Sequence, residues 1–280
     1  MSQAITKIKT RIKSVSGAYK VTSAMKLVST VKLKQWKNKM LSNRDYFNEV
    51  GEIVDLLLKY SHGINNDYLQ TNDTTKNLYL VISSTLGLCG SYNNNIFKVA
   101  DVTIKEEDEA IILGGKGISH FKNGAFTSIP GFEEYSSIND KEIVDKISSY
   151  ILDEYKNGTY REIHIIYSEY KNSLVFLAKD YKLLPMVNDN EEEPLGFPPI
   201  MEPDQKTLLD SIIPFYLRSL IYSKLLESAV CEQAARSNAM ENATNNAKEI
   251  LDNLKIEFNK ARQSSITQEI IEIVAASKGV

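Results

Sequence analysis

The sequence predicts an α/β protein in which a long antiparallel coiled coil of the N- and C-terminal helices carries a central Rossmann-like α/β domain. Two observations predict the coiled coil: residues 215–277 contain neither proline nor glycine, and apolar residues recur at three- and four-residue spacing near both chain ends. The central domain is predicted because short apolar runs alternate there with glycine-rich turns and amphipathic segments. We expect domain boundaries at 1–60, 61–205 and 206–280.

The C-terminal segment predicts one uninterrupted helix from about residue 206 to about 276. At about 1.5 Å per residue it would be roughly 105 Å long, whereas the mean helix of globular proteins has about 11 residues. Its apolar stripe consists of Met240, Ala243, Ala247, Ile250, Leu254, Phe258 and Ala261. From Ile266 onward apolar residues cover most of the circumference, a pattern typical of burial on most sides. Either this end packs into its own domain or frays in solvent, or it inserts into a socket of another protein.

The N-terminal segment predicts a second long helix, from residue 3 to about 58. Its apolar stripe consists of Ile5, Ile8, Ile12, Val15, Ala18, Val21, Met25, Val28 and Val31. Antiparallel pairing with the last helix would bury both stripes and leave the C-terminal end projecting past the N-terminus. Residues 1–50 carry 11 Lys and Arg and only two acids, so this segment is strongly basic in a chain of net charge −3. An acidic protein, nucleic acid, anionic lipid or a mitochondrial transit signal could explain it, although the stripe is long for a transit peptide.

The middle of the chain predicts a small domain with a mostly parallel sheet. Strands are predicted at 78–82, 110–113, 163–167 and 174–178. Helices are predicted from about Asn93 and over 138–155. The polar segment 61–76 precedes this domain, and the acidic, proline-rich segment 189–204 predicts a linker back to the last helix.

Neither glycine-rich turn of this domain fits a nucleotide-binding motif. The turn at 114–117 lacks the four-residue spacing of a P-loop, and the turn at 87–90 lacks the third glycine of a dinucleotide fingerprint. The three histidines have no neighbour at metal-ligand spacing, and Cys89 and Cys231 lie far apart. We therefore expect no catalytic residue, no cofactor and no metal. The sequence also has no apolar run long enough to span a membrane and no signal-peptide core.

Several segments, in order along the chain, resemble the gamma subunit of the F-type rotary ATP synthase, its central stalk shaft. The strongest is NKARQSSITQEIIEIV at 259–274, which is similar to the family signature. The others are AMKLV at 24–28 followed by Lys32-Leu33, GLCG at 87–90 with Asn93, GKG at 115–117 and LLP at 183–185. Departures from the family pattern are Cys231 in place of a serine, Ser237-Asn238 in place of a bulkier apolar pair, and Ala275-Ala276 in place of glycine-rich residues.

The resemblance implies a non-catalytic subunit that transmits torque, because the ATP sites of this family lie on partner subunits. The implied partners are the alpha and beta subunits of the catalytic hexamer, the epsilon subunit and the membrane rotor ring of c subunits. The implied location is peripheral, on the cytoplasmic side of a bacterial plasma membrane, with the mitochondrial matrix as the less favoured alternative. Contacts with the hexamer are implied for Met25, Lys26, Arg262, Gln263, Thr267, Glu269 and Ile270.

Three other functions compete with this interpretation. A nucleic-acid or lipid-binding scaffold would use the basic first helix, but its bases alternate with an apolar stripe and have few aromatic residues among them. A small α/β enzyme with helical extensions would bind nucleotide through residues 77–205. A paralogous shaft would serve an ATP-driven motor that is not coupled to proton translocation, and the sequence does not separate it from the synthase.

Overall fold

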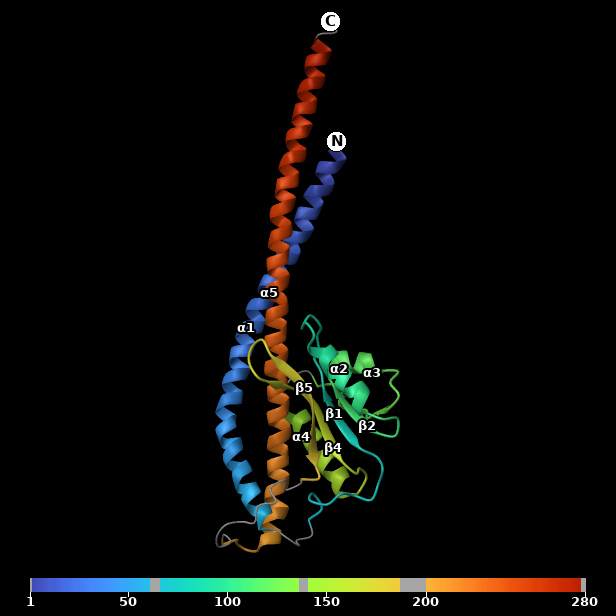
Figure 1. Cartoon of the computed structure of the whole chain (residues 1–280), viewed down its shortest axis with the longest axis vertical. Coiled ribbons are helices and arrows are strands. Elements are labelled where there is room, and N and C mark those ends of the chain that lie inside the picture. The colour runs from blue at the N-terminus through green and yellow to red at the C-terminus, as the bar shows by residue number, and fades with distance from the viewer. Residues whose placement is uncertain (1, 61–65, 136–140, 187–199, 278–280) are drawn as a thin grey trace. The chain divides into compact units, whose positions relative to one another are not determined.

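The computed structural model describes residues 2–60, 66–135, 141–186 and 200–277. Its contacts divide the chain into two compact units. The coiled-coil unit consists of Met1–Thr30 and Arg236–Val280, and the α/β unit consists of Val31–Ala235. The predicted fold class is confirmed, since long terminal helices pair with each other and a sheet with helices fills the middle of the chain (Figure 1). The three predicted domain boundaries stay a prediction.

The two long helices agree closely with the predicted ones. Helix α1 runs from Ser2–Lys59 and helix α5 from Gln205–Ser277, so each contributes to both units. Helix α5 also includes Pro214, ten residues from its start, without ending there. The predicted linker and the segment before the sheet lie partly outside the described residues.

In the coiled-coil unit, three polar contacts fix the antiparallel register of α1 and α5. Lys26 Nζ lies 2.7 Å from Glu241 Oε1. The hydroxyl of Thr244 donates to Thr22 Oγ1 at 3.0 Å, and the hydroxyls of Thr30 and Ser237 are 3.1 Å apart. From one contact to the next, the residue number decreases along α1 and increases along α5 by nearly the same amount. The pairing is therefore antiparallel, without a shift of register over these residues.

The buried face of α1 differs from the predicted stripe in its second half. One series of half-buried or buried positions alternates strictly by three and four, as a coiled-coil seam requires: Ile5, Ile8, Ile12, Val15, Tyr19, Thr22, Lys26 and Ser29. The predicted stripe departs from this face after Val15, because it continues three residues later at Ala18, whereas the seam continues four residues later at Tyr19. Consequently Val21 and Val28, which we expected to be buried, are more than half exposed, and Val31 of the α/β unit is exposed too.

The seam of α5 confirms most of the predicted stripe. Met240, Ala247 and Leu254 are buried, and Phe258 and Ala261 are half-buried. The prediction was wrong for Ile250, because its side chain is exposed and the neighbouring Leu251 takes the seam position. The reason is again the three-four alternation, in which 247 is followed by 251 and then 254.

The α/β unit contains one five-stranded sheet in the order β3-β2-β1-β4-β5. The strands are β1 (Leu78–Ile82), β2 (Glu109–Leu113), β3 (Thr127–Ser128), β4 (Ile163–Tyr170) and β5 (Phe176–Leu184). Only β5 is antiparallel to its neighbour, so the sheet is mostly parallel, as predicted. The predicted strands are confirmed at β1, β2 and β4, whereas β5 begins later than predicted and is longer.

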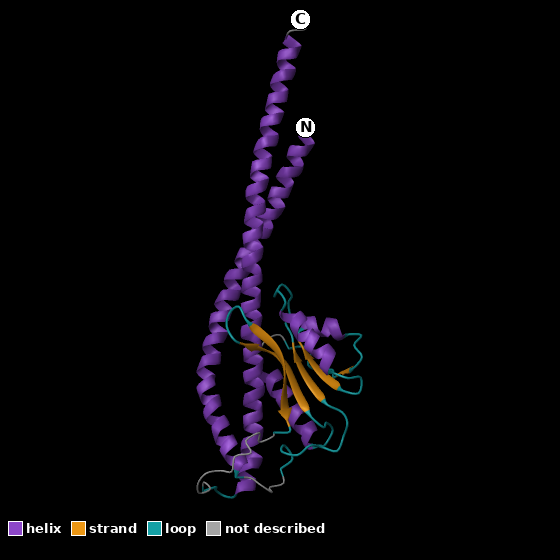
Figure 2. Cartoon of the chain, in the orientation of Figure 1, coloured by secondary structure: helices purple, strands orange, loops and turns teal. Residues whose placement is uncertain are grey.

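Helices cover both faces of this sheet (Figure 2). They are α2 (Tyr92–Thr103), α3 (Gly115–Phe121) and α4 (Lys141–Lys156). One core packs Leu80 and Ile165 of the sheet against α4, α1 and the first part of α5, with Ile147 of α4 fully buried. The other core packs Val81 and Ile166 against α2 and α3. Burial on both faces explains why β1 is apolar throughout instead of alternating with polar residues.

The corrected seam of α5 can be tested with a pair of substitutions. Leu254→Ala should destabilise the purified subunit by about 2 kcal/mol or more, because Leu254 is buried, whereas Ile250→Ala should cost less than about 1 kcal/mol. Chemical denaturation followed by helix circular dichroism measures both. Equal losses, or a larger loss for Ile250→Ala, would contradict the seam.

Candidate functional site

The seven predicted contact residues lie in the coiled-coil unit, but in two separate zones. Met25 and Lys26 lie on α1 opposite residues near 241 of α5, as the ion pair of Lys26 with Glu241 shows. Arg262 to Ile270 begin about twenty residues further along α5, which corresponds to roughly 30 Å of helix. The structure therefore does not bring the seven residues together.

In the zone on α1, the Lys26 ammonium group already forms an ion pair with Glu241. The Lys26 side chain is 37% exposed and the Glu241 side chain 49% exposed, so their ion pair at 2.7 Å is solvated. Such pairs typically contribute less than about 1 kcal/mol. Another carboxylate could replace Glu241 at small cost, while Met25 beside it is half-buried.

The same zone contains exposed apolar residues, of which Val21 and Val28 were expected in the seam and Leu27 was not. Val21, Leu27 and Val28 are 59%, 66% and 56% exposed, and they lie within about two turns of α1. The signal that could have identified them is the strict three-four alternation, which admits Thr22 and Ser29 to the seam and excludes Val21 and Val28. These three residues form the outer apolar patch of α1.

The zone on α5 is an exposed apolar segment, which we call the α5 tip and define as Ile266–Val274. Its aliphatic residues have exposed fractions between 47% and 69%. They are Ile266, Ile270, Ile271, Ile273 and Val274. The last half-buried position before them is Ser265, so the seam with α1 ends where the tip begins. Contiguous exposed apolar side chains indicate a surface that another protein covers.

The polar residues of the α5 tip are satisfied along the helix itself. The Thr267 hydroxyl donates to the Gln263 carbonyl at 2.9 Å, and Gln268 donates to Glu272 at 3.0 Å. The Ser265 hydroxyl donates to Glu269 at 3.4 Å. Arg262 and Gln263 are exposed just before the tip. The tip therefore presents aliphatic side chains whose polar neighbours are oriented by the helix.

An aromatic groove of about 460 Å³ lies in the α/β unit among α1, α4 and α5. Its aromatic lining is Tyr46, Phe47, Phe215 and Tyr222. Arg218 also lines it and donates to Ser149 Oγ at 3.3 Å. This volume is in the range of protein binding pockets, and such pockets are also lined largely by aromatic and apolar side chains.

At the glycine-rich turn 114–117, the missing Cβ atoms allow segments of the chain to pack closely. Gly114 has φ of +90°, and a Cβ there would lie 2.3 Å from the Ser83 carbonyl oxygen. A Cβ on Gly117 would lie 2.5 Å from Ser83 Oγ, which accepts the Gly117 N–H and donates to the Leu113 carbonyl. The Gly117 backbone N–H is thus already hydrogen-bonded within the fold. Among the described residues, no group of three or more His, Cys, Asp or Glu side chains could hold a metal ion.

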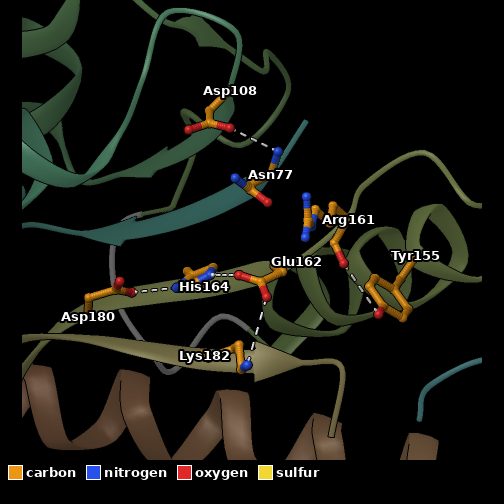
Figure 3. A network of polar contacts seen from close by, with 8 residues as sticks. All are labelled: Asn77, Asp108, Tyr155, Arg161, Glu162, His164, Asp180 and Lys182. Atoms are coloured by element: carbon orange, nitrogen blue, oxygen red, sulfur yellow. Dashed lines mark hydrogen bonds and ion pairs between the residues drawn. The ribbon is translucent and has the colours of Figure 1, made fainter. Parts of the chain in front are cut away.

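His164 lies between two carboxylates on the sheet (Figure 3). Its Nδ1 is 2.9 Å from Asp180 Oδ1 and its Nε2 is 3.2 Å from Glu162 Oε2, while its ring stacks on Tyr79. Lys182 approaches Glu162 at 3.8 Å. Burial opposes the charged imidazole, but the hydrogen bonds and charges of Asp180 and Glu162 outweigh it, so the pKa of His164 is raised. With both ring nitrogens donating, this cluster ties β4 to β5.

The model of the ATP synthase family matches residues 4–280. An ATP synthase gamma chain of Mycoplasma mobile is 39% identical, over 97% of this chain and 97% of that protein. Gamma chains of Mycoplasmopsis pulmonis and Clostridium novyi are 37% and 35% identical, over 97% of this chain in each case and 98% and 96% of those proteins.

Two solved structures of the Euglena gracilis mitochondrial ATP synthase show the same fold. A chain of its rotor matches with a TM-score of 0.63 and 15% identity, over 95% of this chain and 100% of that one. A chain of its OSCP/F1/c-ring assembly matches with a TM-score of 0.65 and 17% identity, over 100% and 95%. In the part of the chain that the structure describes, no helix is long and apolar enough to cross a bilayer.

The His164 cluster makes a pH prediction. Because the folded pKa of His164 is raised, its stabilisation should be complete below about pH 6.5, the ordinary value, and should be lost as pH rises through the folded pKa. At low pH, His164→Gln should lower the free energy of unfolding by about 1.5 kcal/mol, and the difference should shrink in alkaline buffer.

Urea unfolding at several pH values measures this difference. Asp180→Asn serves as the second variant, since it leaves the imidazole but removes the nearer carboxylate. A gap between wild type and His164→Gln that is constant with pH would contradict a charged His164.

Proposed function

This chain belongs to the ATP synthase gamma-chain family, and from that premise we propose that it is the central rotor shaft of a rotary F-type ATPase. In this proposal it transmits torque between a catalytic hexamer of alpha and beta subunits and a base, and couples rotation to ATP synthesis or hydrolysis. The relatives are ATP synthase gamma chains, which favours the synthase over a paralogous motor uncoupled from proton translocation.

The observation that carries the proposal is the α5 tip. It is an end of a long helix with five exposed aliphatic side chains beyond the last seam residue. Apolar contact is non-directional, so a tip of this kind can turn in an apolar sleeve without breaking fixed polar bonds. We propose that the hexamer supplies this sleeve and that Arg262, Gln263, Thr267, Glu269 and Ile270 contact it.

A second contact with the hexamer is proposed for the outer apolar patch of α1 with Met25 and Lys26. The patch supplies exposed apolar surface, and Lys26 can exchange its solvated partner Glu241 for an acidic group of a passing subunit. Such a contact would be made and released once per step, which a weak pair permits.

The role of an asymmetric shaft follows from linkage. Chemically identical catalytic subunits can hold different affinities for nucleotide only if something contacts each of them differently. A two-helix shaft with one apolar patch and one projecting tip is asymmetric, so its rotation would move each site through the same states in turn. ATP chemistry would then take place on the partner subunits and not on this chain.

For the α/β unit we propose the epsilon subunit and the membrane rotor ring of c subunits as partners. The aromatic groove with Arg218 is exposed surface of the α/β unit that suits an apolar segment carrying a carboxylate. We propose that its membrane contact is indirect and that the subunit is peripheral, on the cytoplasmic side of a bacterial plasma membrane.

The proposal predicts that Arg262→Ala combined with Gln263→Ala lowers ATP turnover or assembly of the reconstituted complex at least about tenfold, equal to about 1.4 kcal/mol. Hydrolysis by the purified complex and its subunit content measure the two effects. The matched control is Lys122→Ala with Asn123→Ala, another adjacent base and amide, which lie exposed on the α/β unit. Unchanged coupled activity in the Arg262 and Gln263 variant would overturn the assignment of these contacts.

A further inference from the structure

The carboxyl end of β4 extends beyond its parallel neighbour β1. The β1–β4 register runs from Leu78↔Ile163 to Val81↔Ile166 and β1 ends at Ile82. On its other side β4 pairs with β5 as far as Tyr170↔Phe176. Among the described strands, none therefore pairs with residues 167–170 on the β1 side, although these residues are largely buried.

Side chains of α5 take the place of the missing strand. The Ser168 N–H donates to Ser228 Oγ at 3.1 Å, and the Tyr170 N–H donates to Glu227 Oε1 at 2.8 Å. The Ser168 carbonyl accepts from Cys231 Sγ at 3.3 Å. Residues two apart in a strand direct their backbone groups to the same side, so these three bonds continue the ladder of β4 with helix side chains.

The junction is buried, and its charges are compensated. Ser168, Ser228 and Cys231 are at most 1% exposed. Glu227 lies 3.8 Å from Lys224, whose Nζ donates to Tyr167 Oη at 2.8 Å. Lys224 also lies 4.5 Å from the centroid of the Tyr167 ring. Leaving any of these backbone groups unpaired would cost free energy, so the sequence of α5 is matched to this strand end.

The junction lies where open α/β sheets ordinarily bind ligands. Strand β1 has β2 on one side and β4 on the other, so the strand order reverses between β1 and β4, and ligands of such folds bind outside the carboxyl ends at this point. Here α5 supplies side chains to that edge of β4. The position that serves small-molecule binding in related architectures is used in this chain to attach a helix.

We propose that Glu227, Ser228 and Cys231 are positioning residues that lock the sheet to α5 against torsion, so that a load on the α/β domain reaches the helix without slip. Hydrophobic attraction is non-directional, whereas hydrogen bonds are directional and fix one rotational register. The three side chains come from one face of α5 and engage one strand, which is the arrangement that opposes rotation of the sheet about the helix. This inference rests on the proposed function as a shaft.

The test is a single-molecule measurement on the complex of this chain with its catalytic hexamer. A bead is attached through Asn123→Cys on the sheet side or, in a second preparation, through Glu52→Cys on α1. Both positions are exposed, and the native Cys89 and Cys231 are buried, so a thiol reagent selects the introduced cysteine. The angular variance of each bead at rest gives the torsional stiffness of its attachment.

In Glu227→Ala and in Ser228→Ala, the variance of the Asn123→Cys bead should rise at least about twofold, while that of the Glu52→Cys bead should stay unchanged. Glu227→Gln keeps an oxygen acceptor for the Tyr170 N–H and should restore the wild-type variance. If Glu227→Ala fails to assemble, Ser228→Ala, which removes a single hydroxyl, carries the same expectation.

Equal variances of the Asn123→Cys bead in wild type, Glu227→Ala and Ser228→Ala would overturn the torsional lock. Failure of the proposed function has a different signature, because neither bead would then rotate when ATP is added to the wild-type complex. The resting variances decide about the lock in either case, since they are measured without ATP.

Discussion

The fold depends on one constraint, namely that α5 must bury a face along nearly its whole length. Its first part, to Ala235, closes the larger core of the α/β unit, and its second part, to about Ser265, forms the seam with α1. No glycine interrupts it and Pro214 does not end it. Where the seam ends, aliphatic side chains continue without a partner in the described part of the chain. Burial along one helix thus accounts for both its great length and its exposed tip.

The α/β unit has the architecture of a ligand-binding domain, but the residues at the corresponding positions contact other parts of the same fold. The glycines at 114 and 117 allow their turn to approach Ser83, and the edge where a ligand would bind receives Glu227 and Ser228 of α5. The exposed features of the chain are apolar patches, an aromatic groove and solvated charges. These suit contact with other subunits, as the proposed role as a shaft requires.

Much of the fold could be predicted from the sequence because helices without breakers and short apolar runs are local signals. The bounds of α1, α5 and β1 and the start of β4 follow from them, whereas β4 continues three residues beyond its predicted end. The seam of α1 could not be placed correctly, since Thr22 and Ser29 are polar seam residues and Val21 and Val28 are exposed apolar ones, so hydrophobicity alone points one position away. The pairing of Lys26 with Glu241 and of Glu227 with the backbone of Tyr170 joins residues far apart in sequence, and no local pattern marks such contacts.

We infer that α1 and α5 are paired in one register and turn together. The most direct measurement is oxidation of the complex carrying Thr22→Cys and Thr244→Cys, whose hydroxyl oxygens are 3.0 Å apart in the native chain. The account predicts a disulfide between the two positions, no disulfide in a Val21→Cys and Thr244→Cys control, and ATP turnover that is unchanged by the cross-link. Absence of the cross-link, or a cross-link that stops turnover, would contradict it.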